Sequence, residues 1–148
     1  MPSRVHLRRV ESDGDWAAYH RIRKSVLWEG RGLDGYDERH PDDRLAGNHP
    51  LLLMRDGAPV GTARLDVAGP RLGIVRLVAI EPNLQRRGLG RILMQEVENY
   101  ARGFGLERLE VNAAKEAEGF YQSLGWMTVR SDRNPLMTKA LNPGEIPS

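Results

Sequence analysis

With 148 residues, of which 40% are hydrophobic and 28% charged, the chain has the size and composition of one globular domain. This balance excludes a collagen-like or wholly disordered chain, and the absence of cysteine excludes disulfides, thiolate metal sites and cysteine nucleophiles. The formal net charge of +2 is too small to indicate a nucleic-acid partner. We expect a single domain over residues 1–148, with a core over residues 5–141 and a flexible tail over residues 142–148.

The first third of the chain is expected to hold a strand, a helix and a long loop. Residues 5–10 alternate apolar and polar side chains as a half-buried strand does, and residues 11–15 offer helix-capping groups. The apolar stripe of the following helix consists of Trp16, Tyr19, Ile22 and Val26. Periodicity is lost among the glycines and prolines of residues 28–50, which predicts a loop with a short helix near residues 42–46.

Three strands are predicted in the middle of the chain. Apolar runs at residues 51–54 and 60–67 flank the turn pair Asp56-Gly57, which is a strong hairpin signal. A third apolar run, residues 72–80, follows a second turn at Gly69-Pro70. Strands joined by such short turns predict an antiparallel meander.

The second half mixes helices with strands. Residues 88–104 space apolar side chains by three and four and end before Gly105, which predicts a long amphipathic helix. Further strands are predicted at residues 108–112, 126–129 and 136–141, and a short helix at residues 115–124. The complete order predicts an α/β domain with a mixed sheet.

The segment that joins the third strand of the meander to the long helix favours anions. A helix N-terminus presents unpaired N–H groups, and Gly88 and Gly90 let the backbone approach a phosphate closely. Arg86, Arg87 and Arg91 add charge-assisted donors, although their spacing does not tell which of them face a ligand. The segment is neither a P-loop nor a dinucleotide-binding fingerprint, so ATP and NAD are weak predictions. A pyrophosphate group would suit it.

The run Gln85-Arg86-Arg87-Gly88-Leu89-Gly90 resembles the Gln/Arg-x-x-Gly-x-Gly/Ala signature of the GCN5-related N-acetyltransferases (GNAT). The similarity extends to residues 109–113 and 119–126 in the expected order, and covers residues 5–141 as a whole. The resemblance implies a mixed, mostly antiparallel sheet flanked by helices. It also implies that the fourth and fifth strands splay apart to form a cleft for acetyl-coenzyme A.

The function implied by the resemblance is N-acetyl transfer by direct attack of a primary amine, from a small molecule or a protein, on the thioester of acetyl-coenzyme A. The cofactor-binding residues implied are Val78, Ala79, Ile80, Gln85, Arg86, Arg87, Gly88, Leu89, Gly90, Arg91, Asn112 and Phe120. Asn112 is equally well read as an ordinary turn residue after a strand. A non-catalytic acyl-coenzyme A sensor is the alternative function.

Two catalytic residues are expected. The resemblance maps the proton donor to the leaving thiolate onto Tyr121, although the aromatic pair Phe120-Tyr121 could also simply pack its helix. The family's usual glutamate base has no counterpart in residues 72–80, which offer Arg76 instead. Glu81 is a nearby candidate for the base, with a surface carboxylate as its alternative reading, so the base remains unassigned.

The acceptor is expected to bind at the loop of residues 28–43, which contains six acidic residues and only two arginines. This charge favours a cationic acceptor. The candidate acceptor-binding residues are Trp28, Glu29, Asp37 and Glu38.

Other partners are predicted mainly by what the sequence lacks. The four histidines show no ligand spacing, so no metal is expected, and no apolar run is long enough to span a membrane. We expect a cytoplasmic protein that binds neither nucleic acid nor membrane. A homodimer is possible if the last strand, residues 136–141, extends the sheet of a second copy.

Overall fold

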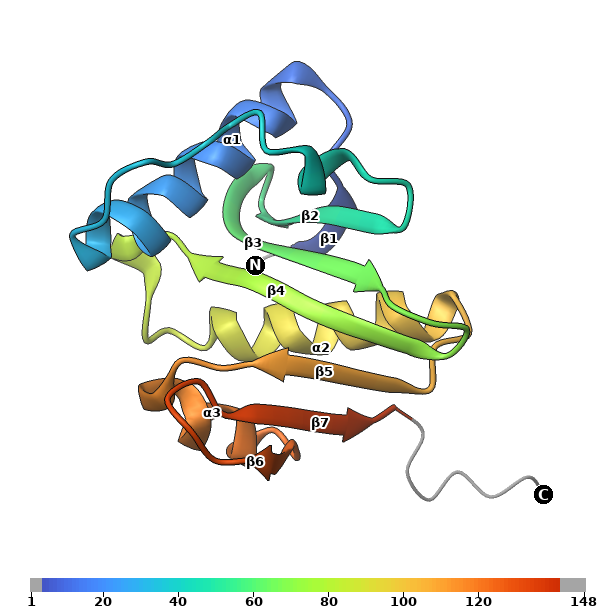
Figure 1. Cartoon of the computed structure of the whole chain (residues 1–148). Helices are drawn as coiled ribbons and strands as arrows, with labels where there is room; N and C mark the ends of the chain where they lie inside the picture. Colours follow the sequence, from blue (N-terminus) through green and yellow to red (C-terminus); the bar gives the residue numbers. More distant parts are fainter. Residues whose placement is uncertain (1–3, 142–148) are drawn as a thin grey trace.

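The computed structural model describes residues 4–141, and the predicted tail at residues 142–148 lies outside them. Within the described residues the strands form one seven-stranded sheet in the order β1-β2-β3-β4-β5-β7-β6 (Figure 1). The strands are β1 (Val5–Arg9), β2 (Asn48–Arg55), β3 (Ala58–Val67), β4 (Leu72–Ile80), β5 (Arg108–Asn112), β6 (Met127–Arg130) and β7 (Leu136–Ala140). Only the β4–β5 pair is parallel among the pairings in the described part of the chain. The predicted mixed, mostly antiparallel sheet is confirmed.

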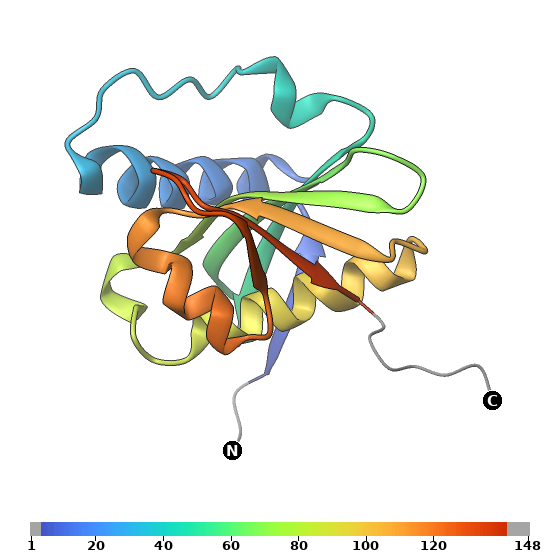
Figure 2. The ribbon, with the colours of Figure 1, turned by 60° about the horizontal axis from the view of Figure 1, so that its bottom comes forward.

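Helices cover both faces of this sheet. The longer helices are α1 (Asp13–Arg23), which a π-helical turn extends over Lys24–Trp28, and α2 (Leu89–Gly103). The shorter ones are α3 (Glu118–Ser123) and the 3-10 turns η2 (Glu29–Arg31), η3 (Pro41–Arg44), η4 (Pro82–Leu84) and η5 (Lys115–Ala117). Figure 2 shows α1 and the loop after it on one face, with α2 and α3 on the other. None of the helices in residues 4–141 is long and apolar enough to cross a membrane.

Alternation along the strands gives the sheet two different faces. In β3, Ala63 and Leu65 are buried in the main core, where they meet the apolar face of α2 through residues such as Leu93 and Val97. Arg64, which lies between them, projects to the α1 face. The residues of β3 and β4 are therefore placed to build a core on one side and a polar site on the other.

Strands β4 and β5 separate partway along their length. Their parallel pairing runs from Leu72 to Val75 on β4, whereas β4 itself continues to Ile80. Leu77 has a φ of 56°, and the register with β3 shifts opposite this point, so a bulge redirects β4. The predicted splay between the fourth and fifth strands is confirmed.

The start of β2 and the place of the last strand in the sheet differ from the sequence prediction. Strand β2 begins at Asn48 and includes Pro50, which the sequence placed in the loop. Proline is tolerated there because the pairing of β2 with β1 stops at Leu51, so no ladder bond to β1 is lost. The last strand is not placed to extend the sheet of a second copy, because β7 lies between β5 and β6 and is not an edge strand.

Candidate functional site

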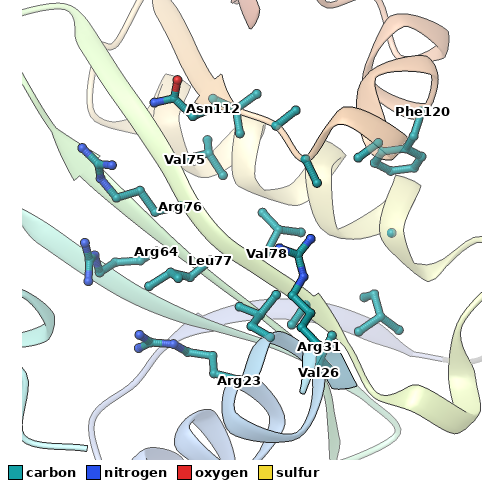
Figure 3. A pocket seen from close by; sticks show the side chains of 18 of the residues that line it. Arg23, Val26, Arg31, Arg64, Val75, Arg76, Leu77, Val78, Asn112 and Phe120 are labelled. Atoms are coloured by element: carbon teal, nitrogen blue, oxygen red, sulfur yellow. The ribbon is translucent and has the colours of Figure 1, made fainter. Parts of the chain in front are cut away.

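A cavity of about 1260 Å³ opens where β4 leaves β5 (Figure 3). Its walls come from the splayed strands, from the loop before α2, and from α1 with the loop that follows it. Single-ligand pockets have volumes of roughly 300–1,000 Å³. The cavity is therefore large enough for an extended ligand and a second, smaller molecule.

The N-terminus of α2 faces this cavity without a side-chain cap. Its N-cap residue is Gly88, with a φ of 83°, and Ile92 N donates to Gly88 O at 3.2 Å. The N–H groups of the first helical residues have no carbonyl partner within the helix. Nothing lies within 4 Å of the position that a Cβ at Gly88 would occupy. Glycine is therefore favoured here by the left-handed backbone conformation and not by a shortage of space.

The arginines of the same loop differ in their positions. Arg86 and Arg91 line the cavity, whereas Arg87 does not. Gly90 also lines it, and a Cβ there would lie 3.3 Å from Cζ of Phe120, so glycine lets the Phe120 ring approach the helix. Two cationic side chains and the open helix end therefore face the cavity together.

The edge of β4 exposes backbone groups to the splay. Glu81 N donates to Val60 O of β3 at 2.9 Å. Because alternate residues of a strand direct their backbone groups to opposite sides, the backbone groups of Val78 and Ile80 point toward the splay. Gln85 Nε2 donates to Ile80 O at 3.0 Å, which ties the loop to the end of the strand.

Tyr121 lies at the other side of the cavity. Only 5% of it is exposed, and its ring contacts those of Trp126 and Phe120, with centroids 5.4 and 5.2 Å away. Burial raises the pKa of Tyr121 to about 12, so the hydroxyl keeps its proton at neutral pH. Asn112 at the end of β5 also lines the cavity.

Several predicted site residues lie elsewhere. Trp28 and Asp37 line the cavity, whereas Glu29 and Glu38 do not. Glu81 is also absent from the lining, and its carboxylate accepts a hydrogen bond from Arg21 at 2.9 Å. The geometry therefore gives no support to Glu81 as the base.

A buried ion network was missed by the sequence reading. Asp43 Oδ1 accepts from Arg23 Nη1 at 2.8 Å and from Arg64 Nη1 at 3.1 Å. Asp66 accepts from Nε and Nη2 of Arg64 at 2.8 and 3.0 Å, and from Arg76 Nε at 2.8 Å. Burial favours protonation of Asp43, but the charges of Arg23 and Arg64 outweigh it and hold the pKa of this carboxyl below its ordinary value. All three arginines line the cavity.

A signal for this network was present in the sequence. Arg64 and Asp66 alternate with the apolar residues of their strand, and Arg23 falls four residues after Tyr19, on the apolar stripe of its helix. Charged side chains at such positions are expected to be paired or functional. What the sequence could not show is which carboxylates pair with them.

The loop over the cavity is held by aromatic contacts. The Tyr36 hydroxyl lies 2.6 Å from His20 Nδ1, and its ring centroid lies 4.6 Å from that of Trp28. Burial raises the pKa of Tyr36 to about 12. Tyr36 lines the cavity, so α1 anchors the loop at this point. Among residues 4–141, no group of three or more histidine, aspartate or glutamate side chains could hold a metal ion.

Comparisons with known proteins find related sequences. The Acetyltransferase (GNAT) family model matches residues 13–126. A Bacillus subtilis (strain 168) protein named as a putative acetyltransferase is 27% identical over 129 residues, which cover 86% of this chain and 87% of that protein.

Two solved structures share the fold. An N-acetylglutamate synthase from Neisseria gonorrhoeae, complexed with coenzyme A and N-acetyl-glutamate, has a TM-score of 0.75 and 21% identity over 95% of this chain and 36% of its own. An aminoglycoside 6'-N-acetyltransferase complexed with coenzyme A has a TM-score of 0.76 and 11% identity over 93% of this chain and 97% of its own.

Proposed function

This chain belongs to the GNAT family of acetyltransferases, and we propose that it transfers an acetyl group from acetyl-coenzyme A to a primary amine of a small molecule or a protein. The observation that carries the proposal is one cavity that contains both the open N-terminus of α2 and the splayed edge of β4. The first suits a pyrophosphate, and the second suits an extended arm with amide groups.

The proposed cofactor position follows from these two features. The pyrophosphate would accept hydrogen bonds from the N–H groups at the start of α2, with Arg86 and Arg91 beside it. The pantetheine arm would pair with the backbone of Val78 and Ile80 in place of the missing strand partner. Coenzyme A is present in both solved structures named above, which supports this cofactor.

The proposed chemistry needs no covalent enzyme intermediate. The neutral amine attacks the thioester carbonyl, the C–N bond forms and the C–S bond breaks, and the leaving thiolate takes a proton from the Tyr121 hydroxyl. The attacking nitrogen releases one proton to water, and water returns a proton to the Tyr121 phenolate. A backbone N–H near Val78 would stabilise the oxyanion that develops on the carbonyl. Because burial raises the pKa of Tyr121 to about 12, this hydroxyl is protonated when the thiolate leaves.

The test measures the release of free thiol from acetyl-coenzyme A in the presence of each amine of a panel. We expect amine-dependent release, slowed by about tenfold or more in Tyr121→Phe, because phenylalanine keeps the ring packing and removes the proton. Tyr100→Phe is the matched control, because Tyr100 contacts His49 and does not line the cavity.

The outcomes separate the two candidate roles. Binding of acetyl-coenzyme A without thiol release on any amine would favour the non-catalytic sensor. An unchanged rate in Tyr121→Phe would remove this residue from the mechanism.

A further inference from the structure

The ion network of Arg23, Asp43, Arg64, Asp66 and Arg76 lies on the face of the sheet opposite α2. Arg64 and Asp66 alternate with core residues of β3, and Arg76 lies directly opposite Arg64 on β4. Figure 2 places α1 and its loop on this face and α2 on the other. The network is therefore on the side from which an acceptor would reach the thioester, away from the proposed pyrophosphate position.

The network has one positive charge in excess, because three arginines share two aspartates. Two cations directly opposite each other on neighbouring strands, as Arg64 and Arg76 are, repel. The side chains of Arg23 and Arg64 are only 4% and 7% exposed, so water screens them poorly. A bound anion would balance the excess charge.

Arg76 is the exposed member of the network with donors to spare, whereas Arg23, whose Nε has no partner, is buried. Its Nε donates to Asp66, and its two Nη groups form no hydrogen bond within residues 4–141. The side chain is 43% exposed and lines the cavity. In Figure 3, Arg76, Arg64 and Arg23 extend in the same direction along one side of the pocket. A planar guanidinium with two free Nη groups matches the two oxygens of a carboxylate.

Among the other charged groups of the lining, Arg86 and Arg91 lie at the proposed pyrophosphate position. Arg31 on η2 donates to Glu116 at 3.3 Å, so this cation is already paired. Of the six acidic residues in the loop at residues 28–43, only Asp37 and Asp42 line the cavity, and Asp43 is neutralised within the network. The loop is thus less able to select a purely cationic acceptor than its sequence suggests.

Building on the proposed function, we propose that the acceptor is an amine that also carries a carboxylate, as an amino acid does, and that Arg76 binds this carboxylate. Arg64 and Arg23 support the position through the shared aspartates. The fold alone does not select this class of acceptor. One of the two solved structures named above is an N-acetylglutamate synthase, and the other is an aminoglycoside 6'-N-acetyltransferase.

The test compares free amino acids with their C-terminal amides as acceptors, using thiol release from acetyl-coenzyme A. The amide has the more weakly basic amine, so more of it is unprotonated and chemistry alone favours the amide. We expect kcat/KM to be about tenfold or more higher for the acid than for the amide in at least one pair.

The substitution Arg76→Gln should remove this difference. It should lower kcat/KM for the acid by about tenfold and leave the amide unchanged, since only the acid has a carboxylate to bind. Arg71→Gln is the matched control, because Arg71 is 73% exposed, pairs with Glu107 and does not line the cavity. Unchanged binding of coenzyme A by Arg76→Gln would verify that the variant is folded.

Equal kcat/KM for acids and amides, an equal loss for both in Arg76→Gln, or a preference for an aminoalkyl phosphate would each overturn the inference. Reaction with no member of any pair would overturn it too. Binding of coenzyme A and thiol release with other amines would then show whether the protein is an acetyltransferase with a different class of acceptor.

Discussion

His20 and His49 are buried neutral imidazoles that link distant parts of the chain. Each Nδ1 lies beside a tyrosine hydroxyl, that of Tyr36 for His20 and that of Tyr100 for His49, at 2.6 and 2.9 Å. Burial lowers the pKa of both, with additional contributions from the charges of Arg23 and Arg9 respectively. The folded protein therefore resists their protonation.

This resistance predicts how stability depends on pH. The unfolded chain binds protons near the ordinary histidine pKa of 6.5, whereas the folded chain binds them only at lower pH. The contribution of these two neutral histidines to the free energy of unfolding should therefore be complete above about pH 6.5. It should decrease as the pH falls below that value. Urea unfolding between pH 7.5 and pH 5 measures the decrease.

Substituting the buried histidines tests the cause. The double variant His20→Asn, His49→Gln should show a flatter dependence over this range, whereas His6→Gln, at an exposed position, should keep the wild-type dependence. An undiminished slope in the double variant would refute the assignment.

Gly61 shows how closely β3 and β4 approach beside the splay. A Cβ at this position would lie 2.8 Å from Cδ1 of Ile80 and 3.1 Å from the Ala79 carbonyl oxygen. The side chain of Ile80 can move, but the backbone oxygen belongs to the paired part of the sheet. Glycine is thus needed to keep the end of β4 in place.

We predict that Gly61→Ala destabilises the protein by about 1–3 kcal/mol through overpacking. Gly69→Ala is the control, because nothing lies within 4 Å of a Cβ at Gly69 and its φ is not positive. Chemical denaturation of both variants provides the measurement. A Gly61→Ala protein as stable as Gly69→Ala would mean that the strands can separate at no cost.

The elements that the sequence predicted best are those set by local pattern. Strand β5 has the predicted bounds, and α2 differs from its prediction by one residue at each end. The helix predicted over residues 115–124 is divided into η5 and α3, and the one near residues 42–46 is a 3-10 turn starting at Pro41. Boundaries were missed where proline or pairing with a distant strand decides the conformation, as at Pro50.

In the proposed function, the two faces of the sheet correspond to a cofactor side and an acceptor side. The proposed phosphate-binding loop could be predicted because its glycines, its arginines and the start of its helix are neighbours in the sequence. The acceptor side could not, because Arg23, Asp43, Arg64 and Arg76 come from four separate segments. Glu81 is near the end of β4 in the sequence, but its carboxylate pairs with Arg21 and does not line the cavity.

The proposed function depends most on the binding of acetyl-coenzyme A at the start of α2. The most direct measurement is a calorimetric titration of wild type, Gly88→Asn and Gly88→Asp with acetyl-coenzyme A. Asparagine and aspartate both tolerate positive φ and both cap helices well, so the two variants differ mainly in one negative charge.

We predict that the wild type binds, and that Gly88→Asp binds about tenfold or more weakly than Gly88→Asn because its carboxylate repels the pyrophosphate. Added salt should narrow this difference. Absence of binding by the wild type, or equal affinities of the two variants, would contradict the placement of the cofactor at this helix.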